Sequence, residues 1–172
     1  MTDIIVIGAG TAGMTAALYA LRNGKSVLVL EGDCVGGQIA NSPRVENFPS
    51  VKAISGSEFA DNLFEQITAL GAQFELDKVQ NVEKTADGIF RVKAEYGVYE
   101  ARAVIIATGA KHKKVGVPGE EEFSGKGVSY CAVCDGAFYS GEEVALVGDA
   151  NTALQYSLLL SNYCKKVYVC TW

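Results

Sequence analysis

The sequence predicts an α/β fold that contains two βαβ units, and three observations support this prediction. An apolar run at residues 4–7 has the length of a buried strand, and a glycine-rich turn follows it. An alanine- and leucine-rich helix then ends near residues 23–24, before a second apolar strand at 26–30. The same order of strand, turn, helix and strand begins again near residue 143. This alternation is typical of a sheet of parallel strands covered by helices.

Composition and charge exclude several classes of protein. The 172 residues can form one domain, or one domain and part of another. The net charge of −5 argues against nucleic-acid binding, because the release of counterions requires a basic protein surface. The chain contains no apolar run of the roughly 20 residues that cross a bilayer, and residues 1–3 show no basic targeting flank. We therefore expect a cytoplasmic protein without a membrane segment.

The segments between the two βαβ units predict a helix, a small antiparallel region and a linker. Ser55 and Glu58 form a capping box ahead of the helical apolar face of Phe59, Leu63, Ile67 and Leu70. Short strand-like runs over 73–102 suggest an antiparallel excursion, and 102–110 reads as a buried strand with a small-residue turn. The Pro-Gly pair at 118–119 marks a linker. We expect domains at 1–112 and 113–172.

The first glycine turn has the pattern of a dinucleotide-binding site. Gly8, Gly10 and Gly13 form GxGxxG between a strand and a helix, as in Rossmann-like domains. Gly8 permits the tight turn, Gly10 lets a pyrophosphate approach the backbone, and Gly13 lets the helix pack closely on the strand. The amides at the start of the helix, at Thr11 and Ala12, would hold the phosphates.

Glu31 ends the strand that follows this helix and completes the pattern. It lies 18 residues after Gly13, where a carboxylate would accept hydrogen bonds from a ribose and disfavour a 2′-phosphate. The turn and Glu31 together predict a bound dinucleotide. They leave open whether that dinucleotide is NAD or FAD.

Cys131 and Cys134 form a CxxC pair followed directly by Asp135. A CxxC at a helix N-terminus brings both sulfurs within disulfide reach, and the helix amides favour the reactive thiolate. A zinc site would need two more ligands, yet the only histidine, His112, lies in a lysine-rich linker and the other three cysteines are scattered. We therefore expect a redox pair and no metal, with Asp135 placed to exchange protons with a thiol.

The motifs GAGTAG, GGQ, ENFP, ATGA, PGE and CAVCDG occur in an order and spacing similar to the thioredoxin reductase family. The resemblance covers essentially the whole chain. It implies a three-layer Rossmann-like domain that binds FAD, followed by the beginning of a second Rossmann-like domain that carries the CxxC. The residues that it places at the cofactor are Gly8, Gly10, Thr11, Ala12, Gly13, Glu31, Gly36, Gly37, Gln38, Asn47, Val82, Ala107, Thr108 and Gly109.

The same resemblance implies a function. Reduced flavin would pass two electrons to the Cys131–Cys134 disulfide, with Cys134 facing the flavin ring. Cys131 would then attack the disulfide of thioredoxin or a thioredoxin-like protein, with Asp135 as acid and base. The resemblance also implies a homodimer.

The sequence departs from the family at its second glycine turn, which reads GDANTA. Asp149 and Ala150 stand where family members that use NADPH carry glycines, and a carboxylate here opposes a pyrophosphate. Thr171 and Trp172 replace the histidine and arginine that hold the 2′-phosphate. We therefore expect a donor other than NADPH, with ferredoxin suspected.

Three alternatives remain at this point. One is an ordinary NADPH-dependent thioredoxin reductase, whose altered second turn binds its nucleotide weakly. Another is a truncated, non-catalytic FAD-binding module, because the family's chains continue well beyond residue 172 and return to the first domain. The third is a related flavoprotein that reduces a peroxiredoxin-type partner or uses the disulfide as an oxidant.

Overall fold

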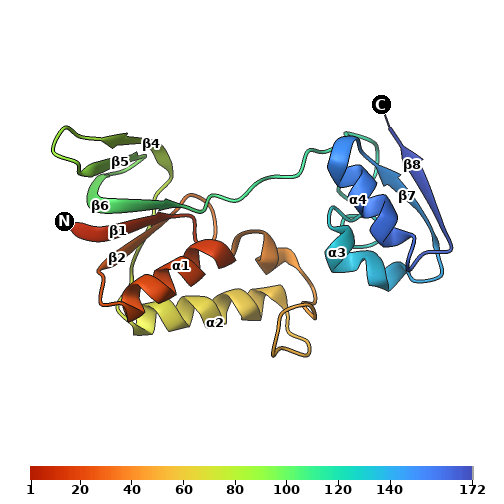
Figure 1. Ribbon diagram of the computed structural model, residues 1–172, viewed down its shortest axis with the longest axis horizontal. Helices are drawn as coiled ribbons and strands as arrows, with labels where there is room; N and C mark the ends of the chain where they lie inside the picture. Colours follow the sequence, from red (N-terminus) through yellow and green to blue (C-terminus); the bar gives the residue numbers. More distant parts are fainter. Residues whose placement is uncertain (172) are drawn as a thin grey trace. The chain divides into compact units, whose positions relative to one another are not determined.

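The computed structural model describes residues 1–171 and divides the chain into two compact units (Figure 1). The first unit spans Met1–Lys111, and the second begins at His112. The expectation that concerns Trp172 lies outside the described residues.

The first unit is built on one six-stranded mixed sheet in the order β3-β2-β1-β6-β5-β4. The strands are β1 (Thr2–Ile7), β2 (Val27–Glu31), β3 (Gln73–Leu76), β4 (Val79–Lys84), β5 (Phe90–Ala94) and β6 (Val98–Ile106). The first three strands and the end of β6 are parallel, with Val6 opposite Val29 on one side and Ile105 on the other. β4, β5 and the start of β6 pair in antiparallel fashion.

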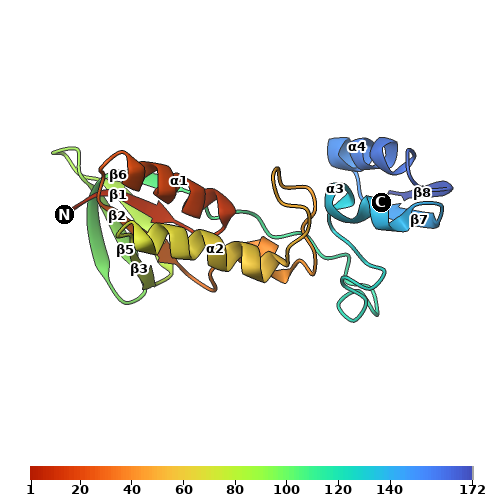
Figure 2. The ribbon, with the colours of Figure 1, turned by 90° about the horizontal axis from the view of Figure 1, so that it is seen from below.

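The alternation of side chains along β1 and β2 gives the first unit one apolar core on each face of these strands. Helices α1 (Thr11–Arg22) and α2 (Gly56–Ala69) lie on one face of the sheet, where Val6 and Val29 point (Figures 1 and 2). Ile5 and Leu30 point to the opposite face and pack against Val92 of the antiparallel strands. Because successive strand residues face opposite sides, both faces are buried at the end of β1 and along most of β2, whereas the edge strand β3 is mostly exposed. The structure confirms the expected α/β fold.

The local signals for α2 are confirmed at both ends. The Ser55 hydroxyl accepts a hydrogen bond from the Glu58 amide at 3.1 Å, which satisfies one of the unpaired N–H groups of the first turn. Phe59 and Ile67 are buried on the expected face, but the expectation for Leu70 is wrong, because it is the C-cap residue after the helix and is 46% exposed. The helix ends at Ala69, and Gly71 follows with a positive φ of 90°.

Two expectations for residues 73–110 are wrong. β3 does not belong to the antiparallel region, because it pairs in parallel with β2 and forms the edge of the main sheet. Residues 98–106 form one continuous strand, whose first part pairs with β5 and whose last part pairs with β1. The second wrong expectation is the buried strand at 102–110. These residues do not form a strand of their own, and the end of the observed strand is not fully buried, since Ile106 is 71% exposed. Short strand-like runs carry no information about their pairing partners, which tertiary packing selects.

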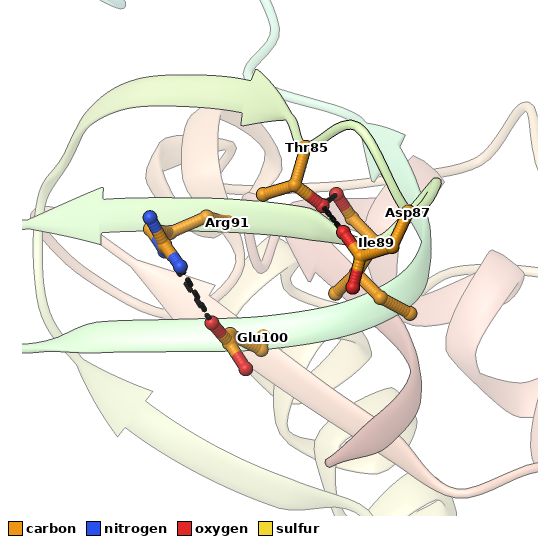
Figure 3. A network of polar contacts seen from close by, with 5 residues as sticks. All are labelled: Thr85, Asp87, Ile89, Arg91 and Glu100. Carbon is orange, nitrogen blue, oxygen red and sulfur yellow. Dashed lines mark hydrogen bonds and ion pairs between the residues drawn. The ribbon is translucent and has the colours of Figure 1, made fainter.

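Side-chain contacts lie at the turn of the β4–β5 hairpin and across the neighbouring β5–β6 pair (Figure 3). The Thr85 hydroxyl contacts Asp87 and donates to the carbonyl of Ile89 at 2.8 Å. The Arg91 guanidinium lies 3.3 Å from the carboxylate of Glu100 on β6. Both partners of this ion pair are exposed, so it adds little stability and mainly favours the observed pairing of β5 with β6.

The second unit repeats the strand, helix and strand order in a smaller form. The parallel strands β7 (Glu143–Val147) and β8 (Lys166–Cys170) flank helix α4 (Ala150–Leu160). A single helical turn, α3 (Ala132–Asp135), and the 3₁₀ turn η2 (Gly136–Tyr139) precede them.

Glu120 holds the segment ahead of α3 in place. Its buried carboxylate accepts hydrogen bonds from the amides of Val115 and Gly116, at 2.9 and 2.6 Å, and from the Tyr130 hydroxyl at 2.8 Å. The Val115 amide is the strongest of several hydrogen bonds that lower the pKa of Glu120, although burial acts in the opposite direction. Glu120 therefore joins residues 115–116 to residue 130, next to Cys131.

We expect the substitution Gly13→Ala to destabilise the first unit by about 1–3 kcal/mol or more, because the new methyl group overpacks a backbone contact. A Cβ on Gly13 would lie 1.9 Å from the carbonyl oxygen of Gly8. Gly10→Ala is the matched control, since a Cβ there has its nearest neighbour at 3.9 Å and the φ of Gly10 is −76°. Urea unfolding followed by circular dichroism measures both variants, and equal stabilities would contradict this packing argument.

We expect Glu120→Gln to lower the melting temperature of the second unit at pH 7 and to reduce its sensitivity to acid. The folded-state pKa of Glu120 is below its ordinary value of 4.5, so its stabilising effect is complete above that value. The effect is lost as the pH falls through the lower, folded-state pKa. The difference in melting temperature between wild type and variant should therefore shrink from pH 7 to pH 3. Glu122→Gln, at an exposed position, is the control, and a constant difference would refute the proposed linkage.

Candidate functional site

The first glycine turn lies where the carboxyl ends of three parallel strands meet. The Gly8 amide donates to the carbonyl of Leu30 at the end of β2, at 2.8 Å. The Ala107 amide, just after β6, donates to the carbonyl of Ile7 at 2.8 Å. A Cβ on Gly8 would lie 2.4 Å from the Ala107 oxygen, and its φ of 106° also favours glycine. The carboxyl edge of a parallel sheet is the usual ligand site in such folds.

The N-terminus of α1 opens directly at this turn. Gly10 is the N-cap residue and provides no side-chain hydrogen bond to the helix. The amides of Thr11, Ala12 and Gly13 belong to the first turn, where helix geometry leaves N–H groups without intrahelical acceptors. A backbone open at Gly10 and a positive helix end suit an anion such as the pyrophosphate of a dinucleotide.

A second glycine pair lies beside the first turn. The Gly36 amide donates to the carbonyl of Ala9 at 2.8 Å, and Gly36 forms an isolated bridge with Gly10. Gly36 and Gly37 both have positive φ, at 95° and 59°, and Gly37 begins the 3₁₀ turn η1 (Gly37–Asn41). The pair therefore brings η1 next to the dinucleotide turn.

Further contacts connect η1 to the rest of this edge. The Gln38 side-chain amide donates to the carbonyl of Ala110, beyond Thr108 and Gly109, both of which are exposed. Gly56, which the sequence analysis did not single out, supports η1 from the other side. A Cβ at this position would lie 1.7 Å from the carbonyl oxygen of Ile39. A glycine directly after a helix N-cap was the only signal for this close approach.

Glu31 holds the first glycine turn through its carboxylate. Its carboxylate accepts hydrogen bonds from the amides of Ala9, Gly32 and Asp33, at 2.7, 2.8 and 2.9 Å. An ionised carboxylate has about four lone-pair positions, so capacity for a further donor remains. The sequence analysis missed the bond to Ala9. The ribose contact stays a prediction.

Two of the expected cofactor residues, Asn47 and Val82, lie outside the glycine turns and η1. Asn47 is exposed and lies in the loop between Val45 and Ile54, which form an isolated bridge. Val82 lies on the edge strand β4, and its side chain packs with the cluster around Val92. Their roles at the cofactor stay predictions.

The CxxC pair forms a disulfide at the start of α3. Cys131 and Cys134 are bonded, with 5.3 Å between their Cα atoms. Cys131 is the N-cap residue, and the Cys134 amide donates to the Cys131 sulfur at 3.2 Å. Cys134 is exposed, whereas Cys131 is half-buried. An amide directed at a sulfur stabilises negative charge there, so this geometry favours a thiolate at Cys131 after reduction.

Asp135 is tied to the cysteine turn through a serine that the sequence analysis missed. The Ser129 hydroxyl donates to the Asp135 carboxylate at 2.5 Å, and its oxygen accepts from the Cys131 amide at 3.1 Å. A serine two positions before the first cysteine was the only sequence signal. The half-buried carboxylate therefore has a defined position next to the disulfide.

The second glycine turn suits a pyrophosphate less well than the first. Asp149 is the exposed N-cap of α4 and makes no side-chain capping bond, so its charge opposes an anion at this helix end. Ala150 has a positive φ of 54°, where a side chain is disfavoured. The Gly148 amide donates to the carbonyl of Cys170 at 3.0 Å, and Thr171 follows directly.

The part of the chain that the structure describes has neither a metal-binding cluster nor a membrane-spanning helix. Among residues 1–171, no three histidine, cysteine or acidic side chains are arranged to hold a metal ion. Within the same residues, no helix combines the length and apolar character that a membrane crossing requires.

Comparison with known proteins gives one family and a consistent set of relatives. The family described as pyridine nucleotide-disulphide oxidoreductase matches residues 2–171. The thioredoxin reductase of Bacillus subtilis is 46% identical over 169 residues, which are 97% of this chain and 52% of that protein. The thioredoxin reductase of Treponema pallidum is 43% identical, over 96% of this chain and 54% of its own length.

The solved structures agree with the sequence comparison. The crystal structure of thioredoxin reductase from Streptococcus pyogenes matches with a TM-score of 0.92 and 43% identity, over 98% of this chain and 55% of that one. This chain therefore spans about half the length of the relatives that it matches. Since the family match runs from residue 2 to residue 171, the chain belongs to the pyridine nucleotide-disulphide oxidoreductase family.

Proposed function

We propose that this chain serves a flavin-dependent disulfide reductase, which passes two electrons from FAD to the Cys131–Cys134 disulfide and then to thioredoxin or a thioredoxin-like protein. The observation that carries the proposal is the disulfide at the start of α3, with the Cys134 amide directed at the Cys131 sulfur. The similarity to proteins named thioredoxin reductase supports the choice of substrate.

FAD fits the first glycine turn. The family and the similar thioredoxin reductases are FAD-dependent flavoproteins. Gly10 and the amides of Thr11 and Ala12 would hold the pyrophosphate, and Glu31 would orient the adenosine ribose. The loops at Gly37–Gln38 and Thr108–Gly109 lie at the same edge and would bound the rest of the cofactor. When bound, FAD supplies the two electrons that reduce the disulfide.

The residues of the cysteine turn have different roles in the remaining steps. Reduction of the disulfide takes up two electrons and two protons and leaves two thiols at Cys131 and Cys134. Cys131, as a thiolate, attacks the partner's disulfide, and Cys134 then attacks Cys131 to release the reduced partner. Asp135 carries protons between the cysteines and the departing sulfur atoms.

The electron donor that we propose differs from the one expected from the sequence. The description of the family names a pyridine nucleotide. The thioredoxin reductases of Bacillus subtilis, Treponema pallidum and Streptococcus pyogenes are not described as ferredoxin-dependent. We therefore propose a reduced nicotinamide nucleotide as donor, in place of ferredoxin. Asp149 and Ala150 predict that it binds more weakly than at a turn with glycine in both positions. The homodimer stays a prediction.

Replacing Cys131 with serine should abolish reduction of thioredoxin, by about a thousandfold or more, because it removes the attacking sulfur. Flavin reduction by the donor should persist, as seen by loss of its visible absorbance. The assay follows thioredoxin thiols after addition of donor. Cys170→Ser, which removes an exposed cysteine of the same unit, should leave activity unchanged.

The complementary variant Cys134→Ser should trap a mixed disulfide between Cys131 and thioredoxin, visible on a non-reducing gel. A trapped adduct with Cys131→Ser instead would reverse the two roles. A purified protein that carries no flavin and shows no donor-dependent change in its thiols would support the non-catalytic alternative.

The donor is tested by anaerobic titration of the flavin with NADPH, NADH and reduced ferredoxin. We expect a nicotinamide nucleotide to bleach the flavin. The double variant Asp149→Gly/Ala150→Gly should need roughly tenfold less nucleotide, because a carboxylate about 4 Å from a phosphate costs on the order of 1 kcal/mol or more. Bleaching by ferredoxin alone, in both proteins, would restore the ferredoxin hypothesis.

A further inference from the structure

We propose that Ser129 is a positioning residue for disulfide exchange, because its single hydroxyl holds the Asp135 carboxylate and the Cys131 backbone at the same time. This inference rests on the function proposed above and extends it to a residue outside the CxxC-Asp motif. The hydroxyl donates its proton to Asp135 at 2.5 Å and accepts the Cys131 amide at 3.1 Å. One side chain therefore links the acid-base group to the first cysteine.

The backbone around Ser129 is restrained from the other side, which gives its hydroxyl a fixed origin. Tyr130, between Ser129 and Cys131, donates its hydroxyl to the buried carboxylate of Glu120 at 2.8 Å. The Tyr130 ring also stacks on His112, with 5.3 Å between ring centroids and 10° between planes. Ser129 directly precedes the anchored residue Tyr130. The planar peptide bond between them therefore restrains Ser129 as well.

The turn that Ser129 closes contains the groups of the second unit that take part in disulfide exchange. The Asp135 amide donates to the Cys131 carbonyl at 3.0 Å, and the Cys134 amide donates to the Cys131 sulfur at 3.2 Å. The Ser129 hydroxyl adds two side-chain bonds to these backbone bonds. Loss of the hydroxyl would release the carboxylate and loosen the N-cap position of Cys131. The amide that stabilises a Cys131 thiolate would then be less well aligned.

Disulfide exchange with the partner proceeds in two steps. The Cys131 thiolate forms a bond to one sulfur of the partner's disulfide, the partner's S–S bond breaks, and the electron pair leaves on its other sulfur. That sulfur takes a proton that Asp135 received from Cys131. Cys134 then attacks the Cys131 sulfur and expels the partner's first sulfur, which takes the Cys134 proton through Asp135. Two thiols are oxidised in this chain and two are formed on the partner, so Asp135 must stay within reach in both steps.

The experiment compares Ser129→Ala, Ser129→Thr and the control Ser140→Ala in the whole chain. Threonine keeps the hydroxyl, and Ser140 lies outside the cysteine turn, where its hydroxyl faces the Tyr163 carbonyl at 3.4 Å. The first readout needs no bound flavin. The chain is reduced with dithiothreitol, the reagent is removed, and alkylation of Cys131 by iodoacetamide is followed by mass spectrometry from pH 6 to pH 9.

Ser129→Ala should slow this alkylation at neutral pH about threefold or more, the effect of one lost hydrogen bond. Ser129→Thr and Ser140→Ala should match wild type. In steady state with thioredoxin, Ser129→Ala should lower kcat by roughly tenfold and leave KM unchanged, because a charge-assisted bond in the reacting turn is lost rather than a binding contact.

A double-mutant cycle separates positioning from a general structural effect. In an Asp135→Ala background, Ser129→Ala should lower kcat by only about threefold further instead of roughly tenfold, because the bond to Asp135 is already lost and only the bond to the Cys131 amide remains to be removed. Additive losses would overturn the proposal, and so would wild-type alkylation and turnover in Ser129→Ala. If wild type itself does not reduce thioredoxin, the proposed function fails, and the alkylation arm alone then decides whether Ser129 positions Cys131.

Discussion

A backbone contact between Gly8 and Gly13 determines the arrangement of the first unit. No side chain fits between the two residues, since a Cβ on Gly13 would lie 1.9 Å from the Gly8 oxygen. This contact lets α1 start directly at the end of β1 and lie against the parallel strands, with Met14 and Ala17 buried. It also brings the positive end of the helix to the carboxyl edge of the sheet. Packing and anion binding thus share one cause.

The polar groups at this edge stabilise the turn before any ligand is considered. Glu31 accepts the Ala9 amide, so the strand β2 and the glycine turn are linked by a charge-assisted hydrogen bond. Gly36 pairs with the backbone at Ala9, which adds a second loop to the same edge. A site whose donors are held in place loses little entropy when it binds, which is the advantage of preorganisation.

The second unit uses the same topology with different chemistry. Its glycine turn carries Asp149 and a strained Ala150, whereas the segment ahead of α3 is held by side chains. Glu120 holds Tyr130, and Ser129 holds Asp135, so the residues on both sides of Cys131 are restrained. The chemistry of this unit therefore depends on polar contacts within about 20 residues of sequence, from 115 to 135.

The sequence by itself determined the elements whose signals are local. The N-cap at Ser55, the glycine turn at Gly8 and the CxxC spacing each depend on neighbouring residues along the chain, and the structure has the α2 cap, the strand-to-helix turn and the disulfide there. Only the tertiary structure decided that β3 joins the parallel sheet, that Glu31 holds Ala9, and that Ser129 reaches Asp135. These contacts depend on which distant or folded-back groups meet in space, and a strand edge or a hydroxyl can accept many partners until packing selects one.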